Sequence, residues 1–153
     1  MAEFYEFHDS YLTQIERREQ LLILRIDAYR HTWPEGFKVN SGTGWTQPIE
    51  ITIEEPSIVS EIVKLPVRIL GGSIKSNILR AKPEDILGHE IPASLSGTSA
   101  VDIEIEGLEE STCEYTLMQI RGKSAAVTHK GEARFVENLP MRKVSNEGTT
   151  TGL

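Results

Sequence analysis

Residues 49–54 and 101–106 alternate apolar and polar side chains with a period of two. Ile or Val occupies every second position, and Thr, Asp or Glu lies between them. Successive side chains of a strand point to opposite faces of a sheet, so both segments are predicted to be β-strands with one buried and one solvent-facing side. Residues 21–29 predict a third strand, because apolar residues occupy every second position from 22 to 28.

Residues 11–17 are predicted to pair with residues 21–29 in an antiparallel hairpin. A two-residue turn at 18–19 closes this hairpin and brings His8 almost opposite Tyr29. The polar residues before and after the hairpin are therefore expected at the same end of the sheet.

The rest of the chain adds further strands and two short helices. Strands are predicted at 65–70, 114–121, 125–129 and 133–137, and glycine-containing turns between the last three predict a meander of consecutive hairpins. Short helices are predicted at 57–63, with Ser57 as N-cap, and at 83–87, with Pro83 at the first position. Long irregular connections are expected at 31–48 and 71–97, where function is often found.

These elements predict an all-β, mainly antiparallel fold, either a β-sandwich or a partly closed β-barrel, with one or two short helices. The length of 153 residues suits one core. We expect a single β domain over residues 1–142. Residues 143–153 are almost free of apolar side chains and are expected to form a flexible C-terminal tail.

The charge of the chain limits its partners. With 23 acidic and 16 basic residues the formal net charge is −7, which disfavours nucleic acid and favours a basic partner. The longest apolar run, residues 21–24, is far shorter than the roughly 20 residues of a membrane span. Cys113 is the single cysteine, so no intramolecular disulfide can form and a cytoplasmic location is predicted. Cys113 itself is expected to be a small core residue.

His8 and Asp9 are predicted to lie near Tyr29 and His31, at one end of the sheet. Two imidazoles and a carboxylate could ligate a metal, so His8, Asp9 and His31 form an alternative metal site. The competing interpretation is that Asp9 caps a turn through its side chain and that His8 is half buried at the edge.

Two tryptophans, Trp33 and Trp45, bracket the glycine-rich residues 41–44. A phosphate-binding loop needs a following helix, whereas an alternating strand follows here. The loop is therefore not predicted to bind phosphate. Because two tryptophans beside one loop can stack on a ligand or anchor a protein, Trp33 and Trp45 are predicted to contact a ligand or a protein partner, together with the polar cluster.

The opening Phe7-His8-Asp9-Ser10, followed by an apolar hairpin, resembles the start of small β-rich bacterial proteins, including immunity proteins that neutralise a toxin. Residues 131–137 resemble bacterial domains of the same layout. The resemblance implies a non-catalytic protein whose acidic face covers a basic active site, and it transfers no functional residues.

The sequence therefore favours a non-enzymatic binding protein without a cofactor, whose partner is a protein or a small ligand. Open sheet edges also allow a homo-oligomer. One alternative is a barrel that encloses a small ligand between residues such as Tyr11, Leu24, Ile51 and Trp45. The other is a metal-assisted enzyme that uses the His8, Asp9 and His31 cluster.

Overall fold

The computed structural model of the chain describes residues 2–33, 42–60, 64–75, 90–91 and 100–139. These residues form ten strands and no helix, and every strand pairing is antiparallel. The strands are β1 (Ala2–Arg18), β2 (Leu21–Trp33), β3 (Gly42–Glu54), β4 (Ser57–Ser60), β5 (Val67–Lys75), β6 (Glu90–Ile91), β7 (Val101–Glu109), β8 (Tyr115–Gly122), β9 (Ser124–His129) and β10 (Arg134–Leu139). The all-β, antiparallel prediction is confirmed.

The strands join in one sheet in the order β10-β3-β2-β1-β5-β7-β8-β4, with β6 beside β1 and β9 beside β3. No pairing among the described strands joins the β4 edge to the β9 and β10 edge, so the sheet does not close into a barrel.

The C-terminal strands do not form the predicted meander. After β8, the chain crosses at Lys123 to the other edge of the sheet, where the Lys123 N–H donates to the Glu54 carbonyl. β9 and β10 then both pair with β3. Gly122 permits the crossing, because a Cβ there would lie 2.4 Å from Ile53 Cγ2. The close approach of β3 and β8 therefore replaces a hairpin between β8 and β9.

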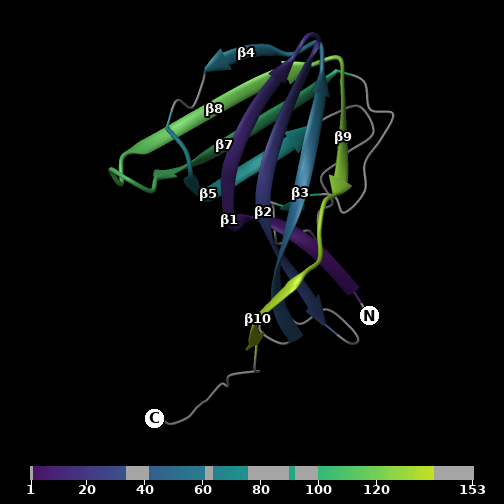
Figure 1. Cartoon of the computed structure of the whole chain (residues 1–153), viewed down its shortest axis with the longest axis vertical. Coiled ribbons are helices and arrows are strands. Elements are labelled where there is room, and N and C mark those ends of the chain that lie inside the picture. The colour runs from purple at the N-terminus through teal and green to yellow at the C-terminus, as the bar shows by residue number, and fades with distance from the viewer. Residues whose placement is uncertain (1, 34–41, 61–63, 76–89, 92–99, 140–153) are drawn as a thin grey trace.

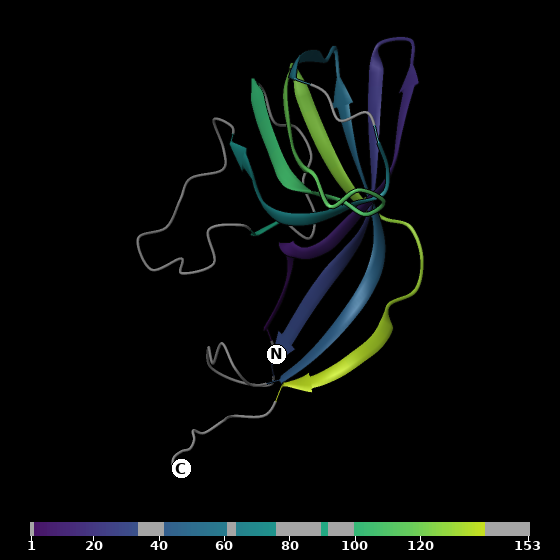
Figure 2. The same ribbon diagram turned by 90° about the vertical axis from the view of Figure 1, so that its left-hand side faces the viewer.

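The sheet bends over itself, so that β5, β7 and β8 run at an angle behind β1, β2 and β3 (Figure 1). The alternating apolar residues of both parts meet in one core, as the alternation predicted. Core side chains that are at most 2% exposed include Leu24, Ile26, Ile49, Ile51, Ile53, Ile103, Ile105 and Ile120. The end of β2 and the start of β3 extend, together with β10, beyond the part of the sheet that encloses the core (Figure 2).

A large bulge in β1 interrupts the pairing of β1 with β2. Glu6 lies opposite Tyr29 and Tyr11 lies opposite Asp27, so four residues of β1 face one residue of β2. Asp9 has a φ of 69°, and the buried Ser10 hydroxyl accepts a hydrogen bond from the Tyr29 N–H at 2.8 Å. The serine thereby supplies the acceptor that the interrupted ladder lacks.

The register of the β1–β2 hairpin differs from the predicted one. Arg18 lies opposite Leu21, so the turn falls at Glu19 and Gln20, one residue later than predicted. Glu19 has a φ of 50°. This positive φ could not be predicted, because the turn contains no glycine. The Glu55 N–H donates to the Gln20 carbonyl at 2.7 Å, so contact with β3 helps to fix the turn.

The predicted helix at 57–63 is wrong for its first four residues, which form β4 and pair with β8. Pairing with a distant strand overrode the local apolar pattern. Residues 61–63 and the predicted helix at 83–87 lie outside the described residues, as does the tail at 143–153. Much of the predicted connection 31–48 belongs instead to β2 and β3, and residues 71–75 extend β5. The described residues contain no helix with the length and apolar character needed to cross a membrane.

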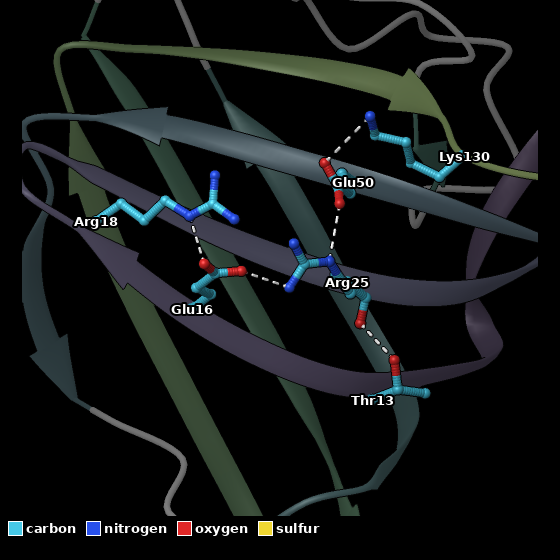
Figure 3. Close-up of polar contacts among 6 residues, drawn as sticks. All are labelled: Thr13, Glu16, Arg18, Arg25, Glu50 and Lys130. Carbon is cyan, nitrogen blue, oxygen red and sulfur yellow. Dashed lines mark hydrogen bonds and ion pairs between the residues drawn. The ribbon is translucent and has the colours of Figure 1, made fainter.

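Charged side chains cross the solvent-facing side of β1, β2 and β3 in a ladder (Figure 3). Arg25 pairs with Glu16 at 2.7 Å and with Glu50 at 2.8 Å, and Lys130 lies 3.8 Å from Glu50. Hydrogen bonds from Arg25 and Arg18 lower the pKa of Glu16. Each of these charged side chains lies next to a side chain of opposite charge, so we interpret the ladder as an ordinary solvent-facing side of the sheet.

Candidate functional site

His8 and Asp9 lie on the β1 bulge and contact each other rather than the hairpin end. His8 Nδ1 is 3.1 Å from Asp9 Oδ2, and their side chains are 54% and 57% exposed. The bulge brings Glu6 opposite Tyr29, so the predicted register that placed His8 near Tyr29 is wrong. His8 is also more exposed than the half-buried edge residue that the sequence suggested.

Tyr29 and His31 lie on one face of β2, and both are nearly buried. The Tyr29 hydroxyl donates to Glu137 of β10 at 2.8 Å, and His31 Nδ1 lies 3.8 Å from Glu6. Burial and the bond to Glu137 raise the pKa of Tyr29 well above its ordinary value. Gly44 leaves room for this ring, because a Cβ there would lie 2.1 Å from the Tyr29 hydroxyl oxygen.

Trp45 lies on the opposite face of the sheet, beside Arg30 and Phe135. The Arg30 guanidinium is 5.4 Å from the centre of the Trp45 ring, and Phe135 meets that ring edge-on at 5.4 Å. Trp45 Nε1 donates to Thr43 at 2.8 Å. The side chain of Trp33 lies outside the described residues. The six predicted contact residues therefore do not form one described surface.

No group of three or more His, Cys, Asp or Glu side chains in the described part of the chain could hold a metal ion. Asp9 lies close enough to Tyr29 to contribute to its raised pKa, but His8, Asp9 and His31 do not converge on one point. His31 is 4% exposed beside Glu6, whereas His8 and Asp9 project to solvent.

The residues predicted to enclose a small ligand do not face a common space. Leu24 and Ile51 are fully buried against the core, and Tyr11 is 36% exposed. Tyr11 lies opposite Asp27, on the other face of the sheet from Leu24, because the later turn and a second irregularity between Leu12 and Gln14 set its register.

A hydrogen-bonded network closes the core beside Trp45. Gln47 Oε1 accepts from Arg30 at 3.1 Å, and its Nε2 donates to the Gly131 carbonyl at 2.8 Å. These two bonds fix the amide orientation, so Tyr5 donates its single proton to Gln47 Oε1 at 2.9 Å. His129 Nε2, 3.0 Å from the Tyr5 oxygen, is therefore the donor in that contact. We interpret this network as structural.

The outward side of β7 carries a row of carboxylates, on the side of the strand that the alternation of residues 101–106 predicted to face solvent. Each one accepts a hydrogen bond from β8. The bonds run from Tyr115 to Glu106 at 2.9 Å, from Gln119 to Glu104 at 2.8 Å and from Arg121 to Asp102 at 3.3 Å. The bond to Glu106 is the main cause of a raised pKa at Tyr115. The carboxylates are therefore held in a fixed row on a regular hairpin.

The turn after β7 continues this charge with the exposed Glu110 and Glu114. We call Glu104, Glu106, Glu110 and Glu114 the acidic face. Residues 101–122 hold six acidic residues and one basic residue, a formal net charge of −5, whereas the whole chain carries −7. Most of the excess charge of the protein thus lies on one hairpin.

Cys113 belongs to this turn rather than to the core. It is exposed, with a φ of 61°, and its N–H donates to the Glu109 carbonyl at 2.7 Å. The predicted buried strand position is wrong because the chain turns between β7 and β8 before β8 begins.

A shallow hollow lies beside the acidic row and has a volume of about 120 Å³. Its lining residues come from β5, β7 and β8: Ser73, Lys75, Asp102, Ile103, Glu104, Gln119 and Arg121. The volume is below the roughly 300–1,000 Å³ of pockets that hold drug-sized ligands.

The acidic face had a signal in the sequence, because six of the acids occur between positions 102 and 114. The pleat then determines which of them point outward. Comparisons of the chain with protein-family models, with curated proteins and with solved structures found no match.

Proposed function

We propose that the chain is a non-enzymatic interaction protein that binds a basic protein partner through the acidic face. The observation that carries this proposal is the net charge of −5 on residues 101–122. A field of one sign speeds the encounter with an oppositely charged partner and disfavours other partners. The bent sheet serves as a β-sandwich-type scaffold that presents the hairpin.

Two features favour a protein partner over a small ligand. The hollow beside the acidic row is shallow, and Tyr115, next to the acids, is 59% exposed. An exposed aromatic side chain beside charged residues is typical of protein contacts. An immunity-type role, in which the acidic face covers a basic active site, is the specific form that the resemblance of residues 7–10 and 131–137 favours.

The test compares two variants of equal net charge. The hairpin variant carries Glu104→Gln, Glu106→Gln and Glu110→Gln, and glutamine keeps an oxygen that can accept from Gln119 and Tyr115. The control variant carries three substitutions at exposed residues elsewhere, namely Glu19→Gln, Glu55→Gln and Glu132→Gln. Wild type and both variants are used to capture partners from a native lysate, and native mass spectrometry reports complexes of defined stoichiometry.

We expect one basic partner to be retained by wild type and by the control variant and to be lost from the hairpin variant. Retention should weaken as salt rises, because the contact is ionic. A partner held equally by all three proteins, or the absence of any stoichiometric complex, would contradict the proposal.

A further inference from the structure

The outward side of β5, β7 and β8 changes in character along β7. At the turn end, Leu108 lies between Arg68 of β5 and Tyr115 of β8, and Tyr11 of β1 lies beyond Arg68. Tyr11 and Tyr115 are 36% and 59% exposed. This row therefore offers aromatic and aliphatic surface to solvent.

The middle of β7 is acidic without a basic neighbour across the strands. Glu106 lies opposite Leu117, and Glu104 lies between Ser73 and Gln119. Each of these carboxylates accepts a bond from an uncharged β8 donor, and no ion pair joins either of them to a described residue.

The far end of β7 is different, because Asp102 lies between two cations. Lys75 of β5 and Arg121 of β8 occupy the paired positions on either side of Asp102. Arg121 is 71% exposed and lies 3.3 Å from Asp102. This end carries a net positive charge and borders the hollow.

We infer that this face binds an extended segment of the partner that presents one apolar, then two basic, then one acidic side chain. The inference rests on the proposed function. The apolar residue packs on Leu108 and Tyr115, the basic residues lie over Glu106 and Glu104, and the acidic residue meets the cations around Asp102. Charge complementarity thus sets the direction of the segment as well as its composition.

The length of the segment follows from strand geometry. Leu108 and Asp102 are six positions apart on one strand, which corresponds to about 20 Å at the usual rise per residue. An extended segment of about seven residues covers this distance. A single small cation or a compact cofactor would match only one part of this face, which is apolar, then acidic, then basic along β7.

The test uses two synthetic peptides of identical composition. The ordered peptide is Phe-Thr-Arg-Thr-Arg-Thr-Glu, and the scrambled peptide is Arg-Thr-Glu-Thr-Phe-Thr-Arg, both with blocked ends. Nuclear magnetic resonance titrations of the full chain at low salt give the affinity and the amides that shift. Because the two peptides have the same net charge, non-specific electrostatic attraction contributes equally to both affinities.

We expect the ordered peptide to bind about tenfold more tightly than the scrambled one. Shifts should fall on β5, β7 and β8, and Glu104→Gln with Glu106→Gln should weaken binding about tenfold. Lys75→Gln should lower the affinity for the ordered peptide but not for a version that ends in Gln.

Equal affinities, shifts on other strands, or no binding of either peptide would overturn the inference. The proposed function would then still stand or fall on the capture comparison, because that comparison does not depend on the order of side chains in the partner.

Discussion

Tyr29 connects the edge strand β10 to the body of the sheet through its hydrogen bond to Glu137. Its pKa is raised, mainly by burial and then by that bond. When pH rises above about 10, the unfolded chain loses the tyrosine proton before the folded chain does, so stability falls. The contribution of Tyr29 is therefore present at neutral pH and is lost in alkali.

Tyr29→Phe is expected to lower the free energy of unfolding by about 1–2 kcal/mol at neutral pH, because it leaves Glu137 without this donor. Between pH 9 and pH 11 the wild type should lose about 1 kcal/mol more than the variant. Urea unfolding followed by circular dichroism measures both quantities. Tyr11→Phe is the control. If wild type and Tyr29→Phe lose the same stability between pH 9 and pH 11, the expectation is contradicted.

Gly44 is required by the same contact. A Cβ at this position would lie 2.7 Å from Tyr29 Cζ, so the ring would have to leave Glu137. We expect Gly44→Ala to destabilise the fold by about 2–3 kcal/mol. Gly131→Ala, whose Cβ would lie 3.2 Å from Pro48 Cγ, should cost much less in the same urea assay. Equal costs for the two variants would show that the Tyr29 contact is unimportant.

At the scale of elements, the β1 bulge depends on Ser10, which is fully buried. Its hydroxyl accepts from the Tyr29 N–H and donates to the Glu6 carbonyl. Ser10→Ala leaves both backbone groups without this partner and should cost about 1–3 kcal/mol. Amide exchange at Tyr29 should also become faster. Thr13→Val removes an exposed hydroxyl bond to the Arg25 carbonyl, which water can replace, and should change stability little.

The bulge also explains why alternation predicted some elements and not others. Residues 49–54 and 101–106 alternate without interruption, and their apolar sides are buried in β3 and β7. The bulge in β1 has no periodic signature, because Phe7 enters the core while Asp9 takes a positive φ. The predicted pairing of His8 with Tyr29 failed at this point, since it assumed an unbroken hairpin.

Tertiary pairing accounts for the other errors. The short apolar run at Ser57–Ser60 suits a helix or a strand locally, and its pairing with β8 decides for the strand. Similarly, Gly122 and Gly131 suggested hairpin turns, although β9 and β10 both pair with β3. Local sequence can identify such strands, whereas their neighbours depend on contacts between distant segments.

At the scale of the whole molecule, charge is distributed unevenly between two solvent-facing sides. The ladder on β1, β2 and β3 alternates acids and bases, as Glu16, Arg25 and Glu50 do. The outward side of β7 instead places Glu104 and Glu106 two residues apart without a base between them. Like charges at this spacing repel, so the acidic face should lower the stability of the fold.

This repulsion predicts that the hairpin variant Glu104→Gln, Glu106→Gln and Glu110→Gln is more stable than wild type at low salt, by about 1 kcal/mol. The gain should shrink at 1 M salt, where the screening length falls to about 3 Å. The control variant with substitutions at Glu19, Glu55 and Glu132 has the same net charge but should gain less. Thermal unfolding of the three proteins at two salt concentrations measures this. The hairpin variant could be more stable than wild type and also lose the basic partner in the capture comparison. That result would mean that the charges of the acidic face favour binding at the cost of fold stability. Equal stabilities at both salt concentrations would mean that the carboxylates are spaced widely enough to act independently.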